Sequence, residues 1–180
     1  MALSATIHKL ELHVADMQRN YYGSHALTLA RHPSETNERM MLRVLAYALF
    51  ADEALAFTRG LSTVDEPALW QKDLTGAIQR WIDLGHPDER RLLQAAGKAD
   101  HVVILCYGGQ ASQVWWDGVR EAARRVRKLT VLAISPAQAQ ALAGLARRTM
   151  SLHVSIQEGT ALLAGAEDSV SVDIAVWREA

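Results

Sequence analysis

The 180-residue sequence contains a single cysteine, Cys106, so no intramolecular disulfide can stabilise the fold. Small secreted domains rely on disulfides because their cores are small, whereas a chain of this length can bury roughly 70% of its unfolded surface without them. Cys106 lies inside the apolar run HVVILCYG, where we expect it to pack as a small hydrophobic residue. These features suit a reducing compartment, and we expect a cytoplasmic protein.

An excess of charge of one sign is also absent, because 19 Lys and Arg residues face 20 Asp and Glu residues. No global positive field therefore attracts nucleic acid or an anionic membrane, and any such binding must come from a local patch. The longest nearly apolar run, residues 44–51, is far below the roughly 18 residues that span a bilayer. Because His8, Lys9 and Glu11 interrupt the opening segment, we expect no signal peptide, no membrane partner and a soluble protein.

Proline and glycine are sparse, with 4 and 11 residues in a chain that is 49% hydrophobic and 22% charged. This composition is typical of a globular protein and argues against long disordered tails, linkers or low-complexity tracts. The length fits one domain, and we expect residues 1–180 to form it.

The spacing of apolar residues predicts an α/β fold in which a mixed β-sheet is flanked by helices. Ser34 is placed to cap the first helix, which is expected to pack by one apolar face. The predicted elements, in chain order, are strands 3–16 and 24–31, helix 34–52, a hairpin at 68–84, helix 87–97, strand 101–107, helix 111–128, strand 129–135, helix 136–148, and strands 151–157, 160–164 and 170–177.

Carboxylates gather at both strands of the second predicted hairpin. Asp65 and Glu66 precede one strand in TVDEPALW (63–70), and Asp83 ends the other in WIDLGHPDERR (81–91). Open α/β sheets place their sites at such strand ends, and one of the two acids could approach Asp83 across the hairpin. Converging carboxylates repel one another unless a cation compensates them, and Mg²⁺ prefers oxygen ligands. The alternative is that these acids are simply solvated.

Basic residues near these acids and elsewhere on the predicted helices are candidates for phosphate contact. Arg91 starts the polar stripe of helix 87–97, which also carries Lys98, and a cation there could stabilise charge on a phosphorus centre. An exposed helix face is the alternative. The candidates for contact with nucleic-acid phosphates are Arg39 and Arg43, which share a face with Glu35, and Arg120, Arg124 and Arg127.

Four strings identify a family resemblance. RHPSETNERMMLR (31–43), FTRGLSTVDEPALW (57–70), WIDLGHPDERR (81–91) and RRTMSLHVSIQEG (147–159) closely resemble the YaeQ family of small bacterial proteins. With the opening MALSATIHKLELHVADMQRN, the resemblance covers almost the whole chain. It implies a compact variant of the PD-(D/E)XK restriction-endonuclease-like fold, which is a mixed sheet flanked by helices.

The resemblance also implies a Mg²⁺ site. The first acidic motif of that superfamily maps onto Asp65 and Glu66 and the second onto Asp83, with Glu35 or Glu38 as a further metal ligand. The superfamily motif places a lysine two residues after the second acid, where this chain has Gly85.

In relatives the cation moves to the following helix, but the corresponding position here is Gln94, so Arg91 or Lys98 must take its role. An arginine cannot transfer protons near neutral pH because it stays charged, although it can neutralise a phosphate.

Two functions remain open at this point. One is a Mg²⁺-dependent nuclease or phosphodiesterase acting on nucleic acid, with Glu66, Asp83, Arg91 and Lys98 as catalytic residues. The other is a non-catalytic, transcription-related regulatory module that binds nucleic acid or protein on a nuclease scaffold.

Overall fold

The computed structural model describes residues 3–180, which form eleven strands, four α-helices and one short 3-10 helix. The mixed α/β class predicted from the sequence is confirmed. The elements are β1 (Thr6–Asp16), β2 (Tyr21–Arg31), α1 (Asn37–Leu49), β3 (Leu55–Phe57), η1 (Gly60–Ser62), β4 (Leu69–Lys72), β5 (Ile78–Leu84), α2 (Glu89–Lys98), β6 (Ala99–Cys106), α3 (Gln110–Ala123), β7 (Leu129–Ala133), α4 (Pro136–Ala143), β8 (Thr149–Gln157), β9 (Thr160–Ala164), β10 (Ser169–Asp173) and β11 (Ala175–Arg178).

The strands form two sheets, where the sequence predicted one. The first is five-stranded in the order β10-β9-β8-β1-β2, and the second is six-stranded in the order β11-β7-β6-β5-β4-β3. The single strand predicted at 170–177 is split, because β10 pairs with β9 in the first sheet and β11 pairs with β7 in the second. Only Ile174 separates the two strands. The alternation of side chains along a strand does not reveal such a change of partner.

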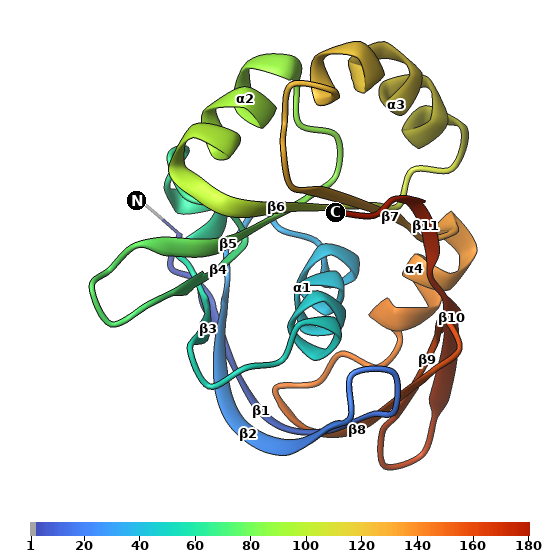
Figure 1. Cartoon of the computed structure of the whole chain (residues 1–180). Coiled ribbons are helices and arrows are strands. Elements are labelled where there is room, and N and C mark those ends of the chain that lie inside the picture. Colours follow the sequence, from blue (N-terminus) through green and yellow to red (C-terminus); the bar gives the residue numbers. More distant parts are fainter. Residues whose placement is uncertain (1–2) are drawn as a thin grey trace.

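Helix α1 lies between the two sheets, whereas α2 and α3 cover the opposite face of the six-stranded sheet (Figure 1). Every residue from Met40 to Ala48 is buried, so the prediction that this helix packs by one face was wrong. The reason is that α1 is packed between layers, where a helix is enclosed on all sides. Apolar residues of α1 and of both sheets share one large core, and a smaller core lies beneath α2 and α3.

The first helix begins at a different cap from the one predicted. Thr36 is the N-cap, and its hydroxyl accepts a hydrogen bond from the Arg39 N–H at 3.1 Å. Ser34 instead contacts the ring of His32 and lies in a turn closed by the bond from the Glu35 N–H to the His32 carbonyl. Because of that turn, the cap of the helix lies two residues later in the chain than predicted.

Strands β5, β6 and β7 run parallel to one another, so their carboxyl ends meet at one edge of the six-stranded sheet. The hairpin predicted at 68–84 is present as β4 and β5, and the short strand β3 extends it. Asp83, near the end of β5, therefore lies at the edge where open α/β sheets place their sites. Among the described residues, no helix combines the length and apolar character needed to cross a membrane.

Candidate functional site

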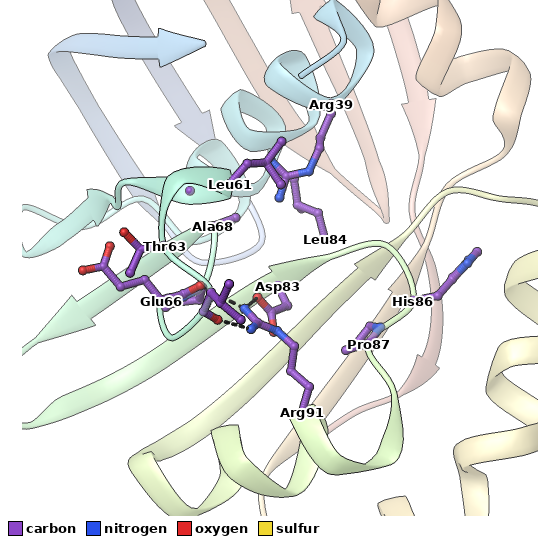
Figure 2. A pocket seen from close by; sticks show the side chains of 13 residues that line it. Arg39, Leu61, Thr63, Glu66, Ala68, Asp83, Leu84, His86, Pro87 and Arg91 are labelled. Carbon is purple, nitrogen blue, oxygen red and sulfur yellow. Dashed lines mark hydrogen bonds and ion pairs between the residues drawn. The ribbon is translucent and has the colours of Figure 1, made fainter. Parts of the chain in front are cut away.

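A pocket of about 350 Å³ opens at this edge of the sheet, between the end of β5, the start of α2 and the loop that precedes β4 (Figure 2). Its volume lies within the range usual for small-ligand sites. The charged and titratable side chains that line it are Arg39, Glu66, Asp83, His86 and Arg91. The pocket thus brings together residues that are far apart in the sequence.

Asp83 forms an ion pair with Arg91. Arg91 Nε donates to Oδ2 at 2.8 Å and Arg91 Nη2 donates to Oδ1 at 2.9 Å, which makes the pair bidentate. The indole N–H of Trp81 donates to Oδ2 at 3.0 Å, because Trp81 and Asp83 share the face of β5 that α2 covers. Only 5% of Asp83 is exposed. Charge-assisted, bidentate bonds of this kind are the strong class, and they satisfy the buried carboxylate.

Arg91 also links the loop before β4 to helix α2 through hydrogen bonds. Its guanidinium donates to the carbonyl oxygens of Val64 and Glu66, the latter at 2.9 Å. Asp88 caps α2 by accepting a hydrogen bond from the Arg91 N–H at 2.8 Å, which fixes Arg91 in the first turn. The pKa of Arg91 is raised, chiefly because the guanidinium donates to Asp83. Arg91 is therefore charged and positioned by four acceptors around the pocket.

Glu66 has a separate arginine partner. Arg59 Nη2 donates to Oε1 at 3.0 Å and the Arg59 N–H donates to Oε2 at 3.1 Å. The pKa of Glu66 is lowered, chiefly by the side-chain hydrogen bond from Arg59. Figure 2 shows the Glu66 carboxylate directed away from Asp83. Asp65 is exposed and lies near enough to Arg91 to help raise its pKa, and neither acid of this motif is hydrogen-bonded to Asp83.

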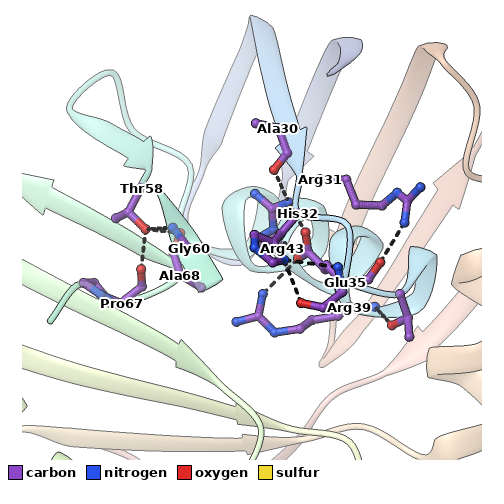
Figure 3. A network of polar contacts seen from close by, with 12 residues as sticks. Ala30, Arg31, His32, Glu35, Arg39, Arg43, Thr58, Gly60, Pro67 and Ala68 are labelled. Atoms are coloured by element: carbon purple, nitrogen blue, oxygen red, sulfur yellow. Dashed lines mark hydrogen bonds and ion pairs between the residues drawn. The ribbon is translucent and has the colours of Figure 1, made fainter. Parts of the chain in front are cut away.

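Glu35 forms a third cluster with two arginines of α1 (Figure 3). Arg43 donates to both oxygens, from Nε to Oε1 at 2.8 Å and from Nη2 to Oε2 at 2.7 Å. Arg39 Nη1 adds a bond to Oε1 at 2.8 Å. Glu35 is 4% and Arg43 2% exposed, so Arg43 cannot reach an external phosphate. The sequence placed these three residues on one face, and they do meet, with Glu35 and Arg43 buried and Arg39 half-buried.

These carboxylates do not form the expected Mg²⁺ ligand set. Across residues 3–180, no three His, Cys, Asp or Glu side chains lie close enough to hold one metal ion. Glu35, Glu66 and Asp83 each accept hydrogen bonds from a guanidinium, which takes the position of a compensating cation. Mg²⁺ needs oxygen ligands that are free to point at one ion. In this arrangement guanidinium groups occupy the carboxylate oxygens that Mg²⁺ would need.

The other predicted residues near the site lie outside the pocket lining. Lys98 is exposed at the end of α2, with Nζ 5.8 Å from the centre of the Trp81 ring. Glu38 is half-buried in the first turn of α1 and is absent from the lining.

The arginines predicted on helix 111–128 do not share a helical face. Helix α3 ends at Ala123, where the chain tightens into turns and Arg178 of β11 donates to the Ala123 and Val126 carbonyls at 2.7 and 2.8 Å. Arg120 pairs with Asp117 and Arg124 pairs with Glu121, both at 3.1 Å and both exposed. Arg127 lies beyond the helix. Contact between these residues and phosphate remains a prediction.

Two contacts at the site were not predicted from the sequence. Arg59 was not recognised as the partner of Glu66, since the two residues stand seven positions apart in a segment with no periodic pattern. Ser112, which is 2% exposed, accepts a hydrogen bond from the Gly108 N–H at 2.7 Å and lies 2.7 Å from Nε2 of His86. The only sequence signal for the latter was the βα turn that follows the apolar strand at 101–107.

Comparison with known proteins agrees with this architecture. A family model described as YaeQ protein matches residues 1–174. The uncharacterized YaeQ proteins of Salmonella typhi and Escherichia coli K12 are 44% and 42% identical to this chain over 99% of each chain. The crystal structure of a YaeQ protein from Xanthomonas axonopodis pv. citri is 45% identical, with a TM-score of 0.95 over 98% of this chain and 100% of that one. A YaeQ protein from Pseudomonas syringae is 37% identical, with a TM-score of 0.92 over 98% and 97% of the two chains. The chain therefore belongs to the YaeQ family.

Proposed function

We propose that this protein is a non-catalytic module that binds a backbone phosphate of nucleic acid in the pocket at the end of β5. The observation that carries the proposal is the bidentate pair between Arg91 and Asp83. A nuclease of the resembled superfamily needs this carboxylate as a metal ligand, whereas here a guanidinium neutralises it. A cation that stays charged can hold a phosphate but cannot exchange protons with it.

Arg39 is the residue best placed to bind the phosphate. It lines the pocket, and 19% of its side chain is exposed. Glu35 does not depend on it, because Arg43 already donates to both carboxylate oxygens. The remaining donors of Arg39 are therefore available to an anion. Leu61 and Val64, which line the same pocket and are 45% and 84% exposed, offer an apolar surface for a sugar or base.

The test is binding of fluorescein-labelled oligonucleotides, single- and double-stranded DNA and RNA, followed by fluorescence anisotropy across a salt series. Arg39→Gln should weaken binding and reduce the magnitude of the log–log salt slope by about 0.7–0.9, the loss of one phosphate contact. Arg148→Gln removes an exposed arginine far along the chain and serves as the matched control. Failure of the wild-type protein to bind any of these probes at low salt would refute the proposal.

A second candidate is a Mg²⁺-dependent nuclease, and one observation favours it: Glu66 and Asp83 line the same pocket. This function requires Arg91 to release Asp83 when the metal arrives. Calorimetric titration of Mg²⁺ or Mn²⁺ into the wild type and Asp83→Ala tests that step, and equal heats in the two proteins exclude a metal role for Asp83. Metal-dependent cleavage that Asp83→Asn abolishes would establish the nuclease and overturn the non-catalytic proposal.

A further inference from the structure

The five-stranded sheet ends in a long and unprotected edge strand. Strand β2 is the outermost strand of that sheet and contains eleven residues, Tyr21–Arg31. Its register with β1 runs through all eleven pairs without a bulge. Natural proteins protect such edges with lysine, proline, bulges or short strands, because exposed edges pair with other chains. From Tyr21 to Ala30 the strand contains no Lys, Arg, Asp, Glu or Pro.

Alternate backbone groups of β2 point away from the sheet. Lys9 of β1 donates its N–H to Arg148 on the β8 side, so the even-numbered residues of β1 face β2. These pair with odd-numbered residues of β2, as Leu10 does with Leu27. The even-numbered residues of β2 therefore direct their N–H and C=O groups outward. Consistently, the Ala30 carbonyl accepts a hydrogen bond from Arg43 Nη2 at 3.2 Å.

The outward groups nearer the middle of the strand lack partners. Within residues 3–180, no backbone hydrogen bond outside the ladder with β1 involves Tyr22, Ser24, Ala26 or Thr28. All four residues are exposed. The edge therefore offers a row of donors and acceptors in the geometry of a β-ladder.

We propose that β2 pairs antiparallel with β2 of a second copy of this chain, with the two-fold axis at Ala26, so that the two five-stranded sheets become continuous. This register places Tyr22 opposite Ala30 of the second copy and Ser24 opposite Thr28 of the second copy. Ala26 lies opposite itself. All of these side chains are uncharged and most are small, so two strands can approach without a like-charge contact.

Charge complementarity at the ends of β2 indicates that the strand pairing with it comes from a second copy of this chain. The same register places Arg31 of the second copy opposite Tyr21. Tyr21 lines a pocket of about 500 Å³ together with Asp52 and Glu53. Arg31 is half-buried and incompletely paired within the described residues: its Nη1 donates to the Glu35 carbonyl at 2.7 Å, whereas its Nη2 forms no hydrogen bond. A guanidinium with spare donors thus meets an acidic pocket, and symmetry repeats the contact.

The first test measures the mass of the protein in solution by analytical ultracentrifugation from micromolar to millimolar concentration. The wild type should move from 19.8 kDa towards twice that mass as concentration rises. Ala26→Lys places like charges at the axis and should weaken association by at least about ten-fold, as should Ala26→Glu. An equimolar mixture of the two variants should restore the dimer, because only a position that faces itself is rescued in this way.

Two matched controls locate the interface. Ser151→Lys adds the same charge to an exposed position of β8, a central strand of the same sheet, and should leave the dimer unchanged. Glu53→Lys should weaken the dimer, whereas Glu167→Lys, at another exposed position, should not. Circular dichroism checks that each variant is folded. A wild-type protein that stays monomeric at every concentration, or a dimer that survives Ala26→Lys, would overturn the proposal.

Discussion

Replacing Arg91 by methionine tests whether the pocket depends on a buried ion pair. The side chain of Asp83 is 7% exposed and that of Arg91 is 28% exposed. The substitution removes two hydrogen bonds to Asp83 and two to loop carbonyls, and it leaves the carboxylate with only the indole N–H of Trp81. Loss of one member of a buried pair costs about 3–5 kcal/mol, and the partial exposure of Arg91 places the expected loss near about 3 kcal/mol.

For a chain of this length, such a loss lowers the melting temperature by roughly 6–12 °C. Urea denaturation followed by circular dichroism gives the free energy of unfolding directly. The double variant Asp83→Asn with Arg91→Met should recover part of the loss, because no unpaired charge remains buried. Arg125→Met is the control, since its pair with Glu89 is 63% and 55% exposed and its loss should stay within about 0.5 kcal/mol. An Arg91→Met loss as small as this control would refute the reasoning.

Three further predictions concern stability. Thr36→Ala should cost about 1 kcal/mol in urea denaturation because Thr36 caps α1, whereas Ser34→Ala should stay within about 0.5 kcal/mol. Arg43→Met should cost about 3 kcal/mol or more, since it leaves the buried Glu35 with Arg39 alone. Burial lowers the pKa of His25 and of His101 from the ordinary value of 6.5, so the unfolded chain takes up protons first as the pH falls. Their contribution to stability is therefore present above about pH 6.5 and is lost as the pH falls below that value through the lowered pKa values of the folded state. Melting temperatures of the wild type and of the His25→Gln, His101→Gln double variant across this range measure the effect, and equal slopes would contradict it.

Elements with strong local signals were predicted well. The apolar run Val102–Leu105 indicated a central strand, and β6 lies between β5 and β7 with both faces covered. The predicted end of the helix at 111–128 was wrong because Arg178, more than fifty residues away, donates hydrogen bonds to the carbonyls of Ala123 and Val126 at the end of α3. The split of strand 170–177 between two sheets likewise depends on long-range partners. Local periodicity carries no information about either contact.

The sequence by itself determined the α/β class, the family and the position of Asp83 at a strand end, because these depend on local periodicity and on similarity along the whole chain. Only the tertiary structure decided which cation neutralises each carboxylate. Asp83 lies in β5, whereas Glu66 and Glu35 lie in loops, and the packing of the chain brings each carboxylate to its arginine partner. The exposed edge of β2 is also a tertiary property, since a strand becomes an edge only when the order of the sheet is known.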